Sequence, residues 1–156
     1  IFWLMNKILN YIFVLFLFAL LSCGYKPILS FKNYNFLINV DSISGDEKIN
    51  SIIVENFNSL KGTKEEYYIN LISKKEINII SKDTKGDPVI FELKISVNYN
   101  VLRNDKVIIE NNFSRKTTYN NISDKFELEN YEKTIINNLA TDISDKIIFS
   151  ISKVNE

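Results

Sequence analysis

The alternation of apolar and polar side chains over residues 91–101 constrains the fold of this 156-residue chain more than any other feature. Every odd-numbered position from Phe91 to Val101 is apolar or aromatic, and every even-numbered position between them is polar. A period of two residues is typical of a β-strand with one buried and one solvated face. Residues 91–101 are therefore predicted to form a strand of an antiparallel sheet that is covered on one side.

A second long strand is expected directly after the first. Asn104 and Asp105 both tolerate positive φ and predict a tight turn, so residues 106–119 would return antiparallel. Polar residues share the apolar face of this strand, which predicts a less buried end or a bulge. One of them, Arg115, would need a carboxylate or a partner, whereas Arg103 is interpreted as a charge at the sheet edge. The other face is expected to be solvated or covered by a polar partner, because it carries Glu92, Lys94, Ser96, Asn98, Glu110, Asn112, Ser114 and Lys116.

Two amphipathic helices are predicted, one before and one after the central strands in the sequence. Ser44 and Glu47 have capping-box spacing before an apolar stripe that ends near Gly62, a helix-stop residue. Asp124 and Glu127 form a second capping pair before apolar residues spaced three or four apart as far as residue 152.

The remaining strands complete a two-layer fold. Residues 34–40 are predicted to form a strand, and residues 67–81 a strand with a bend or bulge at 74–76. The expected order is β-α-β-β-β-α. We therefore predict an α+β two-layer sandwich in which two helices pack on one face of a mostly antiparallel four-stranded sheet.

The first residues have the pattern of an export signal. Met5 and Lys7 open a positively charged start, and residues 8–21 are almost wholly apolar. This run is shorter than the roughly 20 residues that span a bilayer, and its length suits a secretory signal. An uncleaved anchor helix is the alternative, although Lys7 and Asn10 would be poorly placed inside it. Met5 is the expected initiator, and Ile1 is the alternative start.

The only cysteine follows this apolar run after a single serine. Leu20-Leu21-Ser22-Cys23 resembles the lipobox of bacterial lipoproteins, in which the cysteine receives a diacylglycerol and an N-acyl chain after cleavage. Several acyl chains on one residue would hold the protein firmly on a membrane. Gly24 stands where an inner-membrane retention signal would have aspartate, so delivery to the periplasmic face of the outer membrane is expected. The predicted organisation is a signal at 1–22, a lipidated tether at 23–33 and a single domain at 34–156; a buried thiol is the alternative role of Cys23.

Composition argues against several classes of function. The chain has no histidine, one cysteine and a formal net charge of +0, which disfavours common acid–base catalysts, zinc sites and nucleic-acid binding. The carboxylate pairs Asp46/Glu47 and Glu65/Glu66 fall at an expected helix start and in an expected turn, where solvated charge is usual. A membrane-anchored hydrolase is therefore the weakest hypothesis. We expect no catalytic residue, no metal site and no cofactor beyond the lipid on Cys23.

Three segments together suggest a family. The Cys23–Pro27 start, the hairpin ending in Phe113-Ser114-Arg115-Lys116-Thr117-Thr118-Tyr119 and the helix carrying Asn138-Leu139-Ala140-Thr141-Asp142-Ile143 resemble the LPS-assembly lipoprotein LptE family, particularly its alphaproteobacterial members. The resemblance implies a non-enzymatic plug inside the outer-membrane barrel LptD that assists its assembly and takes part in lipopolysaccharide transport to the outer leaflet. An auxiliary lipoprotein of a periplasmic lipid-trafficking transporter is the alternative.

The resemblance also implies lipopolysaccharide-binding lysines at two loops. The nearest matches are Lys85, in the turn before the alternating strand, and Lys125, just before the last helix; Lys82 is a rival to Lys85. A lysine at an exposed turn can pair with a lipid phosphate as a point charge. The alternative is that each is a solvated turn lysine in a lysine-rich chain.

Overall fold

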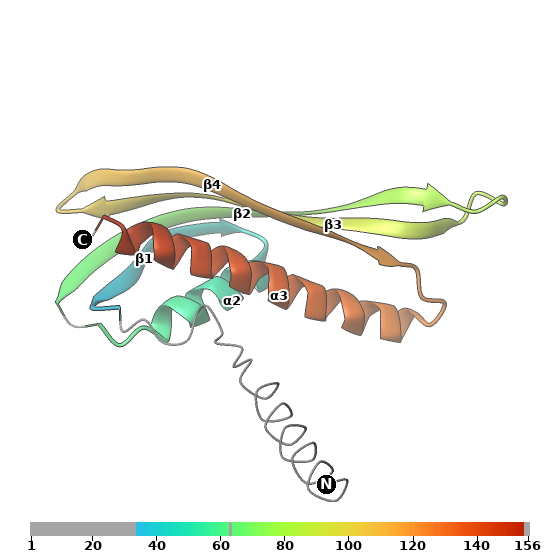
Figure 1. The fold of residues 1–156 in the computed structure, drawn as a ribbon, viewed down its shortest axis with the longest axis horizontal. Coiled ribbons are helices and arrows are strands. Elements are labelled where there is room, and N and C mark those ends of the chain that lie inside the picture. Colours follow the sequence, from blue (N-terminus) through green and yellow to red (C-terminus); the bar gives the residue numbers. More distant parts are fainter. Residues whose placement is uncertain (1–33, 63, 155–156) are drawn as a thin grey trace, which may run out of the picture. The chain divides into compact units, whose positions relative to one another are not determined.

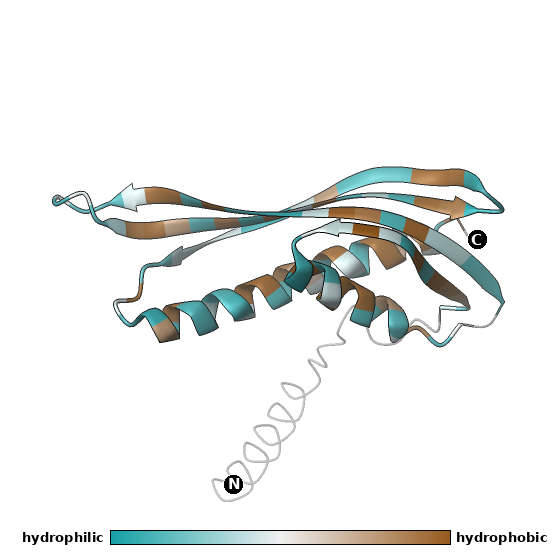
Figure 2. Ribbon diagram, turned by 180° about the vertical axis from the view of Figure 1, so that it is seen from behind, coloured by the Kyte–Doolittle hydropathy of each residue, from teal (hydrophilic) through white to brown (hydrophobic). Residues whose placement is uncertain are grey.

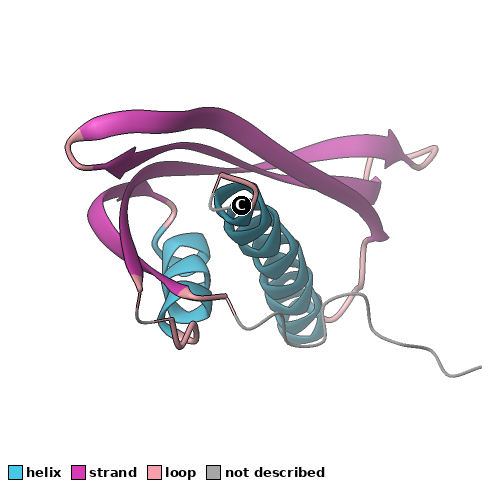
Figure 3. Cartoon of the chain, turned by 60° about the vertical axis from the view of Figure 1, so that its left-hand side comes forward, coloured by secondary structure: helices cyan, strands magenta, loops and turns pink. Residues whose placement is uncertain are grey.

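The computed structural model describes residues 34–62 and 64–154, and the predicted signal, Cys23 and tether lie outside the described residues. The predicted fold is confirmed over the described part, where a four-stranded sheet is covered on one face by two helices (Figure 1, Figure 3). In chain order the elements are β1 (Phe36–Gly45), α2 (Glu47–Asn58), β2 (Glu65–Lys82), β3 (Pro88–Arg103), β4 (Lys106–Asn120) and α3 (Lys125–Ser152).

The strands lie side by side in the order of the sequence. β1 pairs parallel with β2, and β2, β3 and β4 pair antiparallel with their neighbours. The parallel pair needs a crossover connection, which α2 supplies, whereas the antiparallel pairs need only short turns. Asn104 and Asp105 form the predicted turn between β3 and β4 with φ values of 51° and 60°.

The core lies between the sheet and the two helices. The odd-numbered residues of the alternating strand face the helices, and Leu93, Ile95 and Val97 are fully buried. Helix α3 turns residues such as Ile143 and Ile147 toward them, and apolar bands alternate with polar ones along both helices (Figure 2). Because each fully buried aliphatic side chain contributes about 1.5–3 kcal/mol, this single apolar layer is what holds sheet and helices together.

The start of α2 differs from the sequence prediction. β1 continues through Ser44 to Gly45, and Asp46 is the N-cap, with its side chain accepting a hydrogen bond from the Ile49 amide at 3.1 Å. The prediction of a Ser44–Glu47 capping box is therefore wrong. Gly45 makes the sharp exit from the strand with φ +101°, a value that favours glycine.

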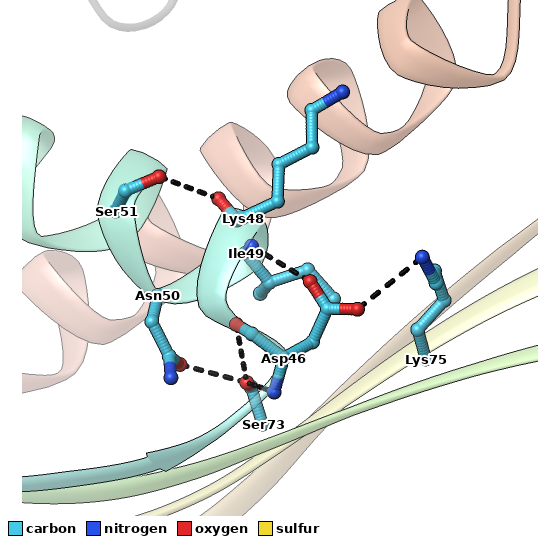
Figure 4. A network of polar contacts seen from close by, with 7 residues as sticks. All are labelled: Asp46, Lys48, Ile49, Asn50, Ser51, Ser73 and Lys75. Carbon is cyan, nitrogen blue, oxygen red and sulfur yellow. Dashed lines mark hydrogen bonds and ion pairs between the residues drawn. The ribbon is translucent and has the colours of Figure 1, made fainter. Parts of the chain in front are cut away.

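A buried polar network ties this helix start to the middle of β2 (Figure 4). The Ser73 hydroxyl accepts from the Asp46 amide at 3.0 Å and donates to Asn50 Oδ1 at 2.7 Å. Asn50 in turn donates to the Ser44 carbonyl at 3.2 Å. Lys75 Nζ lies 3.3 Å from the Asp46 carboxylate, so one turn of helix is joined to two strands.

Gly62 has a different role from the predicted helix stop. α2 ends at Asn58, and Gly62 lies beyond it, buried where a Cβ would collide with the backbone of Phe36. A close approach of two backbones therefore requires the absence of a side chain at this position.

The strands also carry bulges that sequence periodicity did not place. β2 keeps one register with β3 from Tyr68 to Ile79, so a bulge at 74–76 is wrong; the register shifts near Ile80 instead. In β4 the register shifts near Ile108. Each extra residue changes the face on which the following side chains lie.

Candidate functional site

Two segments that the sequence singled out separately lie at one end of the domain formed by residues 34–154, which we call the hairpin end: the β2–β3 turn at 83–87 and the β4–α3 loop at 121–124 (Figure 1). Asn121 fastens them together. Its amide donates to the Val89 carbonyl and its side chain donates to the Pro88 carbonyl, both at 2.8 Å. The predicted lysines therefore belong to one end of the fold.

The β2–β3 turn is held by its own hydrogen bonds. Asp83 Oδ1 accepts from the amides of Lys85 and Asp87 at 2.8 and 2.9 Å, and the Asp83 amide donates to the Asp87 carbonyl at 2.9 Å. Gly86 closes the turn with φ +91°. Aspartate and glycine are turn residues for these two reasons, so Lys85 is displayed from a well-defined backbone.

The three predicted lysines are all exposed. Lys82 ends β2, Lys85 projects from the turn, and Lys125 is the first residue of α3; none of them takes part in an ion pair between described residues. Lys125 follows Asp124, whose side chain caps the helix by accepting from the Phe126 and Glu127 amides at 2.8 and 3.0 Å. The N-cap prediction for Asp124 is thus confirmed.

Exposed apolar side chains accompany the lysines. Phe126 is 74% exposed beside Lys125, Ile79 and Ile80 precede the turn, and Val89 follows it. The hairpin end therefore combines mobile positive charge with uncovered apolar surface. This combination matches an amphipathic anion better than a simple ion, because only the former would cover both kinds of surface.

Burial and aromatic stacking anchor β4 on α3 at this end. Tyr119 stacks on Phe91 with ring centroids 5.5 Å apart, meets Tyr131 edge-on, and donates its hydroxyl proton to Glu132 at 2.5 Å. Burial is the larger cause that raises the pKa of Tyr119 well above its usual range, and the Glu132 carboxylate is the smaller one. The Tyr119 hydroxyl therefore stays protonated and acts as a donor. Sequence reasoning missed Glu132, whose only signal is its place on the sheet-facing side of α3.

The outer face of the sheet, which the helices leave uncovered, carries the predicted polar side chains in register. Ser42 Oγ donates to Asn70 at 2.6 Å, and Asn70 donates to Asn100 at 3.1 Å, so one chain of hydrogen bonds crosses β1, β2 and β3. In the next row Asn112 donates to Asn98. These amides line a shallow hollow of about 770 Å³ on this face.

Charges on the outer face are mostly paired. Glu76 lies 2.7 Å from Lys74 and 3.7 Å from Lys94, while Glu92 lies 2.9 Å from Lys116. Because the lysine side chains of these pairs are exposed, the pairs contribute little stability, but they leave the face hydrophilic without a strong field of one sign.

The two arginines both have carboxylate partners. Arg115 pairs with Asp142 of α3, which meets the requirement stated for an arginine on the apolar side of β4. Arg103 donates to Glu65 across the β2–β3 pair at 3.1 Å and lies over the Tyr67 ring, so it is more than an isolated edge charge.

No helix within 34–62 and 64–154 is long and apolar enough to cross a membrane. The same residues contain no group of three or more histidine, cysteine, aspartate or glutamate side chains placed to hold a metal ion.

The fold is shared with solved structures of bacterial lipoproteins. Rare lipoprotein B from Shewanella oneidensis matches with a TM-score of 0.54 and 15% identity, over 76% of this chain and 100% of that chain. Lipoprotein B from Nitrosomonas europaea matches with a TM-score of 0.60 and 16% identity, over 85% and 92% of the two chains. A minor lipoprotein from Acinetobacter baumannii matches with a TM-score of 0.51 and 13% identity, over 75% of this chain and 92% of that chain. No family model and no curated protein matches the sequence.

Proposed function

We propose that this chain is an outer-membrane lipoprotein, anchored through Cys23, that sits within an LptD-type barrel, assists its assembly and takes part in lipopolysaccharide transport. The observation that carries the proposal is the hairpin end. There the lysines at 82, 85 and 125 lie in or beside two loops joined by Asn121, among exposed apolar side chains. Lipopolysaccharide offers phosphates for the lysines and acyl chains for the apolar surface.

The outer face of the sheet supports the barrel as partner. The lumen of a large outer-membrane barrel is polar, and a plug must present hydrogen-bonding groups to it. The rows of amides, hydroxyls and paired charges on β2, β3 and β4 offer such groups without a buried unpaired charge. The fold shared with bacterial lipoproteins and the lipobox-like sequence ending in Cys23 support the anchored location.

Copurification from membranes tests the partner. We expect the acylated chain, carrying a C-terminal tag and solubilised in mild detergent, to bring down an outer-membrane barrel. Recovery of an inner-membrane ATPase complex instead would favour the transporter-lipoprotein alternative and contradict the proposal.

Lipid attachment is tested by the Cys23→Ala variant. We expect an unacylated precursor that keeps its signal and is lost from the outer-membrane fraction, because the thiol that accepts the diacylglycerol is gone. Fractionation of membranes and the mass of the purified chain report the result, with Ser22→Ala as the matched control that keeps a small residue before the cysteine. Wild-type recovery of Cys23→Ala in the outer membrane would refute the lipobox interpretation.

Lipopolysaccharide binding is tested by reversing charge at the hairpin end. The double variant Lys85→Glu/Lys125→Glu removes two attractions to the lipid phosphates and adds two repulsions. At an exposed site each of these four changes is about 0.3–0.5 kcal/mol, so binding should weaken about ten-fold. Lys64→Glu/Lys106→Glu makes the same charge change at exposed lysines near the opposite end of β2 and β4. Equal binding by the two double variants would show that the hairpin end is not the site.

A further inference from the structure

β2 is longer than the strand beside it. β1 pairs with β2 only as far as Gly45 opposite Ser73, whereas β3 pairs with β2 as far as Lys82. Residues 74–82 therefore have β3 on one side and no described strand on the other; we call this segment the open β2 edge. Figure 1 shows β2 continuing past the end of β1 toward the hairpin end.

The direction of the backbone groups on this edge follows from the pairing. Arg103 and Lys106 flank the tight β3–β4 turn, so their backbone groups bond to each other. The odd-numbered residues of β3 therefore turn their N–H and C=O groups toward β4, and the even-numbered residues turn theirs toward β2. Lys74 lies opposite Ser96, so its backbone groups bond to β3. The odd-numbered residues of β2 therefore turn their N–H and C=O groups away from β3. Consistent with this, a Cβ at Gly45 of β1 would meet the Ser73 carbonyl. On the open edge these outward residues are Lys75, Ile77 and Ile79.

Ile77 and Ile79 place their side chains on the helix-facing side of the sheet, but no described helix covers them there. Ile77 and Ile79 are 43% and 48% exposed, while Leu93, which lies opposite Ile77 on β3, is fully buried. Helix α3 packs against β3 and β4, and α2 packs against β1. Unpaired backbone groups and exposed apolar side chains thus coincide on one stretch of strand, which is what pairing with another strand requires.

Charge decides what kind of strand fits. The open β2 edge carries three lysines, at 74, 75 and 82, and one glutamate, Glu76. Lys74 pairs with Glu76 and Lys75 pairs with Asp46, so the charge that remains uncompensated on this edge is positive and lies at Lys82. A second copy pairing antiparallel about Asn78 would set Lys74 opposite Lys82 at two places, which is unfavourable. An acidic strand would instead be attracted.

We propose that the open β2 edge binds an extended segment of a partner protein, which adds as a strand in line with β1. Its apolar side chains would alternate to contact Ile77 and Ile79, and its other side chains would be acidic. The open β2 edge shares Lys82, Ile79 and Ile80 with the hairpin end. The inference rests on the unpaired backbone groups of residues 75–79 and on neither Lys85 nor Lys125, so it does not require lipopolysaccharide binding.

Amide hydrogen exchange tests the proposal on the full acylated chain in detergent micelles. The probe is a nine-residue peptide of alternating valine and glutamate with blocked ends. We expect exchange to slow at least ten-fold at Lys75, Ile77 and Ile79, because the probe would accept from their N–H groups. Exchange at Lys74, Glu76 and Asn78 should stay unchanged, because those amides already bond to β3. No slowing, or slowing without this alternation, would overturn the proposal.

A substitution on the edge gives a second readout. Ile77→Pro removes an outward N–H without removing a bond to β3, and we expect probe affinity to fall at least ten-fold. Ile77→Val is the matched control and should bind as wild type, and a lysine–valine probe should not bind. Undiminished binding to Ile77→Pro, or concentration-dependent protection of the edge without probe, would overturn the proposal in favour of side-chain contact or a second copy. The exchange pattern of the unsubstituted chain remains decisive if Ile77→Pro impairs folding.

Discussion

Replacing Ser73 by alanine should destabilise the fold more than any other loss of one hydroxyl group on the sheet. The Ser73 side chain is 3% exposed and serves both the Asp46 amide and Asn50 Oδ1, at 3.0 and 2.7 Å. Each buried polar group left without a partner costs about 1–3 kcal/mol. Because the Asp46 amide is only partly buried and the Asn50 amide group can turn, we take the lower end for each and expect about 2 kcal/mol.

Urea unfolding of residues 24–156, followed by far-ultraviolet circular dichroism, measures this loss. With a denaturant slope of about 2 kcal/mol/M, a loss of about 2 kcal/mol lowers the midpoint by about 1 M without changing the slope. Ser96→Ala is the matched control, since Ser96 lies on the outer face and bonds only to Ser114 at 3.1 Å; its cost should stay below about 0.5 kcal/mol. Equal midpoint shifts for the two variants would refute the argument from burial.

Three further variants test the exit from β1, the β2–β3 turn and the surface of α3. Gly45→Ala should cost about 3 kcal/mol or more because a Cβ would overlap the Ser73 carbonyl; Gly86→Ala, with φ +91° but open space around it, should cost only about 1–2 kcal/mol in the same urea assay. Partial burial, and then the Asp142 carboxylate, raise the pKa of Asp145, so its ionised form opposes folding. Asp145→Asn should therefore raise stability at pH 7, and the gain should disappear as pH falls below the ordinary aspartate pKa of about 4; a gain independent of pH would contradict this.

Much of the fold could be predicted because local periodicity reports burial directly. The strict alternation over residues 91–101 predicted β3 and its buried face, and the Asn104–Asp105 turn then determined where β4 lies. The spacing of apolar residues after Asp124 predicted α3. In each case the residues that define an element are neighbours in sequence and share one environment, so no long-range knowledge was needed.

The failures arise where distant segments meet. The Ser44–Glu47 capping prediction was wrong because Ser73 and the parallel pairing with β2 extend β1 by five residues beyond the predicted end at Val40. The sequence predicts that Gly62 stops a helix, whereas the structure shows that the Phe36 backbone leaves no room for a side chain at Gly62. The carboxylate partner of Arg115 lies on α3, 27 residues away. Short-range patterns carry no information on such contacts.

The candidate site shows the same division. That Lys82, Lys85 and Lys125 fall in or beside turns follows from the residues around them. That the two loops share one end of the molecule follows from the antiparallel ladder and from Asn121, which joins them. Sequence alone determined which segments become strands and helices and which of their faces are apolar, since both properties depend on residues a few positions apart in the chain. Only the tertiary structure decided that β2 outruns β1 and leaves an open edge, because strand length depends on which neighbour is available to pair.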